Sequence, residues 1–150
     1  MNIKLSNIHE FTDQEVFDYV AEQLLIQNKR SGNINKCFYL SADGSKCAVG
    51  ILMDDYRKEF DYYKEYTDIS GQKVCNSMPL VSILKEFYPN AVPRFRLLLL
   101  LQTIHDYFEP EEWQIIFKEV RKELFNNEYS RVVKGYANLV IKIKDYHESV

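Results

Sequence analysis

Apolar residues recur every three or four positions along much of the chain, the spacing that places side chains on one face of a helix. The first such segment follows Thr12-Asp-Gln-Glu15, a capping box whose hydroxyl and carboxylate can each satisfy a free backbone N–H. A helix is therefore predicted from about Asp13 to Lys29, ending before Gly32 and Asn33, which suit a positive φ. Its apolar face consists of Val16, Phe17, Val20, Ala21, Leu24 and Leu25.

Further helices are predicted in the second half of the chain, where prolines can occupy a first turn. Two of them cover about 79–88 and 93–107, and a third covers about 109–126 with Trp113 on its apolar face. The run 97–101 is apolar on every side, which is typical of the most buried helix of a domain. The last segment also has helical spacing, although its end alternates and could instead form a strand.

The segment around two cysteines reads differently from the helices. Residues 37–40 are short, aromatic and predicted to be extended, and Asp43-Gly44 is a turn signal. After the turn the chain could return as a strand or begin a helix near Cys47, and the helix is favoured by one apolar face. Gly50 would weaken such a helix, so it is expected to allow a close crossing against the apolar helix at 97–101.

Between these regions, residues 54–66 are charged and rich in tyrosine, which suits either a surface helix or an ordered loop, and 67–78 is predicted to be irregular. Taken together, the patterns predict one mainly α (α+β) domain over residues 1–150, with a small β-hairpin or short strand pair near Cys37. A chain of 150 residues with 46% hydrophobic residues can bury a core as a single domain.

Charge and composition narrow the function classes. Lys and Arg alternate with Asp and Glu for a formal charge of -3, so non-specific nucleic-acid binding is not expected. The N-terminus has no signal-peptide pattern and no apolar run is long enough to cross a bilayer, which predicts a cytoplasmic protein without a membrane partner. Three irregularly spaced cysteines suit a reducing compartment.

The two cysteines of the corner raise the question of metal or nucleophilic chemistry. Structural zinc usually takes closely spaced Cys or His pairs, which the chain lacks, so no metal and no cofactor is predicted. A thiol at a helix N-terminus can have a lowered pKa, and Cys47 with His105 as base and Asp106 as orienting carboxylate would form a hydrolase set. Adjacent side chains diverge by about 100° on a helix, which argues against Asp106 orienting His105.

An alternative is that these residues are structural, with a packed thiol at Cys47 and with His105 and Gln102 pairing backbone groups of the turn. A third reading is ligand binding, in which Arg30 offers a planar fork to a small anion such as a nucleotide. The ligand-binding candidates are Gln27, Arg30, Ser31, Tyr39 and Lys46.

Tyrosines in the charged segment suggest a protein interface, because tyrosine is enriched where binding energy concentrates. They could equally form a half-buried cover over the core, and an interface could also join copies of the chain as a homo-oligomer. The candidates are Tyr56, Tyr62, Tyr63 and Tyr66.

Several motifs together resemble a family of small, functionally uncharacterised proteins of phages, prophages and bacteria. These are Cys-Ala-x-Gly at 47–50 and Leu-Gln-x-x-His-Asp at 101–106, within a matching core of about 13–125. Family members often carry a further cysteine where Ile51 stands, and 126–150 extends beyond the core as a C-terminal extension. The resemblance implies a phage or mobile-element context.

The leading functional prediction is a non-enzymatic, phage-type binding protein. It would act in the host cytoplasm by binding a host protein or signalling molecule, and as an inhibitor it would counter a host defence. The alternative is a cysteine-dependent hydrolase using Cys47 and His105.

Overall fold

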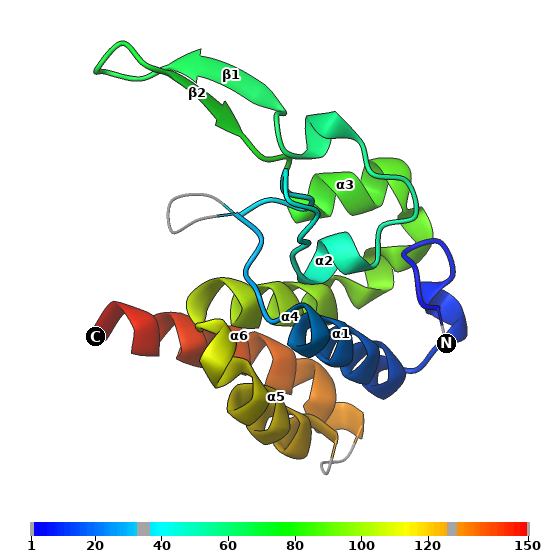
Figure 1. The fold of residues 1–150 in the computed structure, drawn as a ribbon. Helices are drawn as coiled ribbons and strands as arrows, with labels where there is room; N and C mark the ends of the chain where they lie inside the picture. Colours follow the sequence, from blue (N-terminus) through cyan, green and yellow to red (C-terminus); the bar gives the residue numbers. More distant parts are fainter. Residues whose placement is uncertain (1, 33–36, 126–128, 150) are drawn as a thin grey trace.

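The computed structural model describes residues 2–32, 37–125 and 129–149 and confirms a mainly α architecture with one small antiparallel sheet (Figure 1). Helices make up 61% of the structure. The helices are α1 (Asp13–Gln27), α2 (Ala48–Ile51), α3 (Leu80–Phe87), α4 (Phe95–Tyr107), α5 (Pro110–Phe125) and α6 (Tyr129–Ser149), and the strands are β1 (Lys64–Thr67) and β2 (Lys73–Asn76). Short 3-10 turns cover Ile8–Glu10, Lys58–Phe60 and Pro89–Arg94.

The start of α1 follows the predicted capping box. The Thr12 hydroxyl accepts a hydrogen bond from Glu15 N, and the Glu15 carboxylate accepts one from Thr12 N. The helix ends at Gln27, two residues before the predicted end, because Asn28 adopts the left-handed conformation with φ 48°. A left-handed residue at this position is a common way to close a helix.

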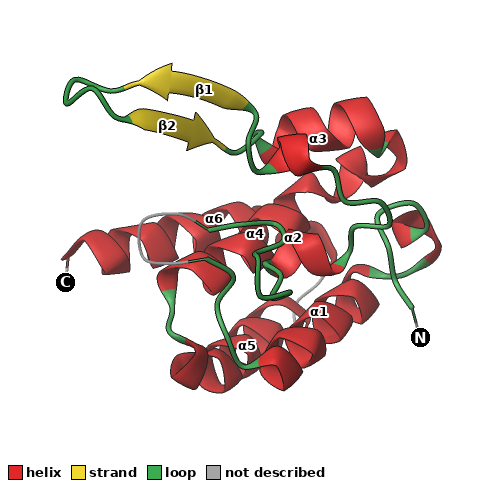
Figure 2. Ribbon diagram, turned by 45° about the horizontal axis from the view of Figure 1, so that its top comes forward, coloured by secondary structure: helices red, strands yellow, loops and turns green. Residues whose placement is uncertain are grey.

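Helix α4 lies at the centre of the molecule and contacts the other five helices (Figure 2). Its leucine run is buried as predicted, apart from Leu99, which is half-buried. Burying side chains on nearly every side of a helix requires neighbours all round, which explains why α1, α2, α3, α5 and α6 surround it. Within the described residues, no helix is both long and apolar enough to cross a membrane.

The sheet lies where the sequence predicted a surface helix or loop followed by irregular chain. β1 and β2 pair from Lys64 opposite Asn76 to Thr67 opposite Lys73. Their connection is closed by the Asp68 carboxylate, which accepts from Ser70 N and Gln72 N, and by Gly71 at φ 85°. Tyrosine, threonine and valine favour strands, and this preference outweighs the charged composition on which the prediction relied.

The corner near Cys37 contains no named strand among its described residues. Single bridges join Gly32 to Cys37 and Leu40 to Lys46 around the predicted Asp43-Gly44 turn. The helix predicted near Cys47 does form, but α2 is a single turn of four residues. The ambiguous C-terminal segment is helical, as α6.

Candidate functional site

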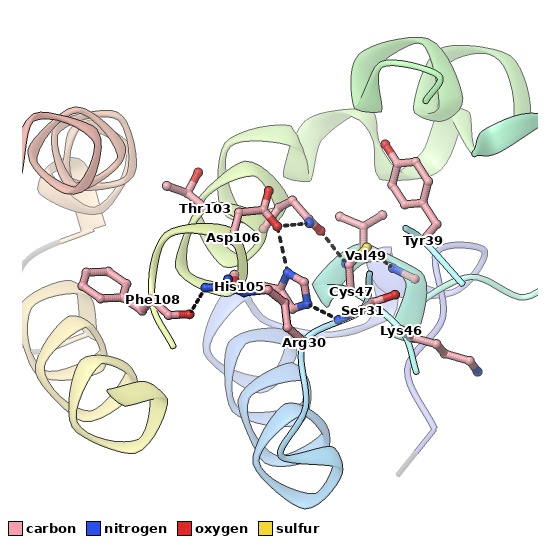
Figure 3. A network of polar contacts seen from close by, with 12 residues as sticks. Arg30, Ser31, Tyr39, Lys46, Cys47, Val49, Thr103, His105, Asp106 and Phe108 are labelled. Carbon is pink, nitrogen blue, oxygen red and sulfur yellow. Dashed lines mark hydrogen bonds and ion pairs between the residues drawn. The ribbon is translucent and has the colours of Figure 1, made fainter. Parts of the chain in front are cut away.

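A buried histidine connects the end of α4 to the chain that follows α1 (Figure 3). His105 is 0% exposed, and its Nε2 atom accepts a hydrogen bond of 3.2 Å from Ser31 N. Because a backbone N–H can only donate, Nε2 carries no proton, and Nδ1–H therefore donates to Asp106 Oδ1 at 2.8 Å. The geometry thus assigns the histidine tautomer.

The contact between His105 and Asp106 corrects the expectation that neighbouring helical side chains cannot meet. Their Cα–Cβ bonds leave the helix in different directions, but both side chains lie in the last turn of α4, where the Asp106 carboxylate bends back to the ring. The ring also stacks on Trp113 of α5, with centroids 5.5 Å apart. His105 is therefore held from two sides.

Gln102 extends the network to α2. Its Nε2 donates to Asp106 Oδ1 at 2.9 Å, and its Oε1 accepts from Val49 N at 3.2 Å. Val49 lies in the first turn of α2, whose N–H groups have no partner within the helix. His105 and Gln102 thus satisfy backbone donors as the structural interpretation proposed, but at Ser31 and Val49 instead of the Asp43-Gly44 turn.

A third side chain at this point, Cys37, is one that sequence reasoning did not select. Burial and the Asp106 carboxylate, to which the thiol is hydrogen bonded, raise the pKa of Cys37 to about 12. One ligand-type atom each of Cys37, His105 and Asp106 lie within 4.8 Å of one another, an arrangement that could be considered for a metal ion. No sequence signal points to it, since 68 or more positions separate Cys37 from the other two.

The hydrogen bonding of His105 opposes a metal ion in this cluster. An ion on Nδ1 would require the proton to move to Nε2, where it would face the N–H of Ser31. An ion on Nε2 would have to displace that N–H at a fully buried atom. The positive charge of Arg30 acts on Cys37 as well and would repel a cation. The arrangement therefore favours a hydrogen-bonded network.

Cys47 occupies the N-cap of α2 with its side chain 1% exposed. Its Sγ accepts a hydrogen bond from Gly50 N at 3.4 Å. Burial raises the pKa of Cys47, which is opposite in direction to the lowered pKa that a nucleophile at a helix N-terminus would need. Among the described residues no hydrogen bond joins this thiol to His105, whose free nitrogen is taken by Ser31.

Gly50 lies against backbone, but its neighbour is not the one expected from the sequence. A Cβ atom at this position would overlap the carbonyl oxygen of Tyr39 and lie 2.9 Å from its carbonyl carbon. The glycine therefore allows the extended segment at Tyr39 to pass close to α2, which also packs against α4.

Two of the predicted ligand-binding residues use their polar groups inside the protein. The Gln27 amide donates to Lys46 O and accepts from Lys46 N, both at 2.9 Å. It therefore satisfies both backbone groups of Lys46, as a neighbouring β-strand does for a residue of a sheet. The Ser31 hydroxyl donates to Ser45 O at 3.1 Å. Both interactions hold the corner against the end of α1.

Arg30, which the sequence suggested as a binding group for a small anion, instead binds the C-terminal end of α4. Its Nη2 donates to Phe108 O at 2.7 Å and its Nε donates to His105 O at 3.3 Å. The last carbonyl groups of a helix have no partner within it and carry partial negative charge. The guanidinium is 17% exposed and also lies 3.7 Å from Glu109.

Tyr39 is likewise engaged on both its backbone and its side chain. Its hydroxyl donates to Met78 O at 3.0 Å, and its N donates to Asp61 Oδ1 at 2.8 Å. Burial raises the pKa of Tyr39. Asp61, which the sequence did not single out, is 0% exposed and also accepts from Leu40 N and from the Tyr56 hydroxyl.

Among the ligand-binding candidates, Gln27 and Lys46 line an open pocket of about 290 Å³, to which Lys46 brings a positive charge. Lys4 lies in the same pocket, and none of the lining residues is a carboxylate. Burial and the nearby ammonium group of Lys46 lower the pKa of Lys4. Asp54 acts on Lys4 in the opposite direction but does not line the pocket, so two close cations remain at its wall and favour a small anion there.

The four tyrosines proposed as an interface divide into two groups. Tyr56 is half-buried, donates to Asp61 at 2.5 Å and packs edge-on against Phe60. Tyr62, Tyr63 and Tyr66 are 46–47% exposed and lie at the base and on the first strand of the hairpin. Only these three are placed to meet a partner.

Comparisons with models of protein families, with curated proteins and with solved structures gave no match.

Proposed function

We propose that this chain is a non-enzymatic, phage-type binding protein that engages a host protein through its projecting hairpin. The observation that carries the proposal is the position of the arm, defined here as residues 62–76, which extends away from the helices (Figure 1). The motif resemblance supports the phage context. In this proposal the protein inhibits a host protein that takes part in defence against phages.

The arm has the composition of a recognition element. Tyr62, Tyr63 and Tyr66 each expose nearly half of their surface, and Ile69 at the tip is fully exposed. Tyrosine combines a large contact area with few rotatable bonds, which limits the entropy lost on binding. Ile69 adds apolar surface at the tip of the arm, which a partner could bury together with the tyrosines.

The base of the arm is fixed, so that its contact groups are held in place before a partner binds. Met78 N donates to Phe60 O at 2.8 Å, and Tyr63 N donates to Asn76 O at 2.7 Å. Phe60 is 0% exposed and Met78 4% exposed, which anchors both ends of the arm in the core. A contact surface that is ordered in advance reduces the cost of association.

The partner chemistry follows from the edges of the sheet. Within the described structure the sheet has two strands, so each offers one edge to an extended segment of another protein. Charged residues on the strands, among them Lys64, Glu65 and Lys73, discourage uncontrolled pairing between copies. We therefore propose an extended, partly apolar segment of a host protein as the ligand.

The test uses immobilised protein, host lysate and mass spectrometry, followed by an affinity measurement with the purified candidate partner. The double variant Tyr63→Ala, Tyr66→Ala is expected to weaken binding by about tenfold or more, as for residues that concentrate binding energy. Ile115→Ala with Ile141→Ala is the matched control, because these residues are 67% and 56% exposed on α5 and α6. Equal affinity of the tyrosine variant and the control would exclude the arm as the surface that binds the partner.

A signalling molecule is the second ligand class, and the pocket between Lys4 and Lys46 favours an anionic one. Titration with inorganic phosphate and with a nucleoside monophosphate, followed by NMR, should shift signals of the pocket residues. Lys46→Gln should abolish the shifts, while Lys29→Gln should leave them unchanged, since the Lys29 ammonium pairs with Asp43 instead of lining the pocket. Shifts that persist in Lys46→Gln would exclude this site.

The cysteine-dependent hydrolase is the alternative proposal, and the Asp106–His105 hydrogen bond is the observation that favours it. It would require Cys47 to become exposed and His105 to exchange Ser31 for the thiol. Alkylation of the native protein with iodoacetamide near neutral pH distinguishes the two functions. The binding proposal expects Cys47 to stay unmodified, and rapid selective labelling would favour the hydrolase.

A further inference from the structure

Helices α1 and α5 enclose an apolar groove on the side of the molecule away from the arm (Figure 2). The groove has a volume of about 560 Å³, and its apolar lining includes Phe17, Ala21, Leu25 and Phe117. The helices run antiparallel here, because Leu25 near the end of α1 and Gln114 near the start of α5 line the same space. Two antiparallel helices with an apolar groove between them form a surface on which a second antiparallel pair could pack, which would make a four-helix bundle.

The two sides of the groove carry opposite charge. Helix α1 contains four acidic residues and no basic residue, and two of the acids, Asp18 and Glu22, line the groove. Its side on α5 is lined by Lys118 and Arg121. Asp18 and Arg121 pair across the groove at 2.8 Å, whereas Glu22 and Lys118 are exposed and form no ion pair with any residue that the structure describes.

This pattern is self-complementary under only one of two possible symmetries. If a second copy is rotated about a two-fold axis parallel to the groove, its acidic side faces the basic side of the first copy. If the axis lies across the groove, acid faces acid and base faces base, which costs free energy. In the first arrangement each α1 also runs antiparallel to the α5 above it, as in an up-down bundle.

We propose that the chain forms a two-fold symmetric dimer in which α1 and α5 of each copy build a four-helix bundle. Leu25 of each copy packs onto the partner's groove, and Glu22 of one copy pairs with Lys118 of the other. Leu25 is 37% exposed and Ile26 71% exposed in the single chain, so both have apolar surface to bury in the dimer. The arm lies outside this interface and stays free in both copies (Figure 2).

Sedimentation equilibrium of the full chain over a range of concentrations tests the dimer. Glu22→Lys and Lys118→Glu each turn two attractive contacts per dimer into repulsive ones and should weaken dimerisation by about tenfold. The double variant Glu22→Lys, Lys118→Glu restores opposite charges and should recover the affinity. Glu119→Lys, the same charge change at another exposed position of α5, is the control and should match the wild type.

Leu25→Arg supplies an independent measurement, because a partly exposed position tolerates the change without unfolding the monomer. It should give a monomer at every concentration with an unchanged circular dichroism spectrum. A wild-type chain that stays monomeric up to near-millimolar concentration would overturn the proposal and would leave the groove for a helix of another protein. A dimer that is insensitive to both charge reversals and to Leu25→Arg would also overturn it.

Discussion

Replacing Gly50 by alanine should strongly destabilise the protein, although alanine is the better helix former. The added Cβ would overlap the Tyr39 carbonyl oxygen and lie 2.9 Å and 3.3 Å from the carbonyl carbon and Cα of the same residue. Real Cβ atoms essentially never approach a neighbour within 3.0 Å. Backbone cannot rotate away as a side chain can, so the whole segment at Tyr39 would have to move.

The cost follows from what holds that segment. Moving Tyr39 strains its hydrogen bonds to Asp61 Oδ1 at 2.8 Å and to Met78 O at 3.0 Å, each contributing about 1 kcal/mol or more. Overpacking of a filled core adds about 1–3 kcal/mol. The gain in helix propensity offsets about 1 kcal/mol. We expect Gly50→Ala to lower the free energy of unfolding by about 2–4 kcal/mol.

Urea unfolding followed by circular dichroism measures this change, and the chain supplies a matched control. A Cβ at Gly135 would meet only a methyl group of Leu124, at 3.2 Å, which can yield by a small rotation. Gly135→Ala should therefore alter stability by less than about 1 kcal/mol. If Gly50→Ala also stays within about 1 kcal/mol of the wild type, the close approach of Tyr39 does not determine the residue at this position.

Three further variants probe the network. His105→Leu should cost about 2–4 kcal/mol in thermal unfolding, because Ser31 N loses its acceptor in a buried site, and a wild-type melting temperature would contradict this. Arg30→Ala should lower the free energy of unfolding in urea by about 1–3 kcal/mol, because the carbonyl groups at the end of α4 lose their donor. The exposed control Arg96→Ala should cost less than about 0.5 kcal/mol, and equal losses in the two variants would refute the prediction. Because the pKa of Cys37 is raised from 9.0 to about 12, the folded state keeps a proton that the unfolded state releases, so stability is full below pH 9 and falls towards pH 12. Cys37→Ser should make that decline shallower in unfolding measured between these pH values, and an unchanged slope would count against the raised pKa.

Local signals in the sequence predicted most helices well. The Thr12 capping box fixed the start of α1, and the apolar run of α4 identified the most buried helix, because each signal acts within one or two turns. The hairpin was misplaced for the same reason. Its strands are charged and mostly exposed, so they lack the alternation of a half-buried strand, and their β-forming tyrosine, threonine and valine were given too little weight.

The site was harder to predict because its contacts join distant parts of the chain. The sequence singled out His105 and Asp106, but the partners Ser31 and Cys37 approach them only after α1 and α4 pack together. The helix-end argument for Cys47 predicted the wrong direction of its pKa shift, since burial outweighs the effect of a four-residue helix. Nothing in the sequence indicated that Asp61 is buried, because it is one of many acidic residues in a charged segment that resembles exposed chain.

The hydrogen bond from Met78 N to Phe60 O has a consequence for how the molecule can vary. It brings the two ends of the arm together at the edge of the core, so the intervening chain behaves as an insertion that a short turn could replace. Related proteins could therefore lengthen, shorten or exchange this stretch while the helical body stays intact. The length and sequence of the arm are therefore free to change without cost to the helical core.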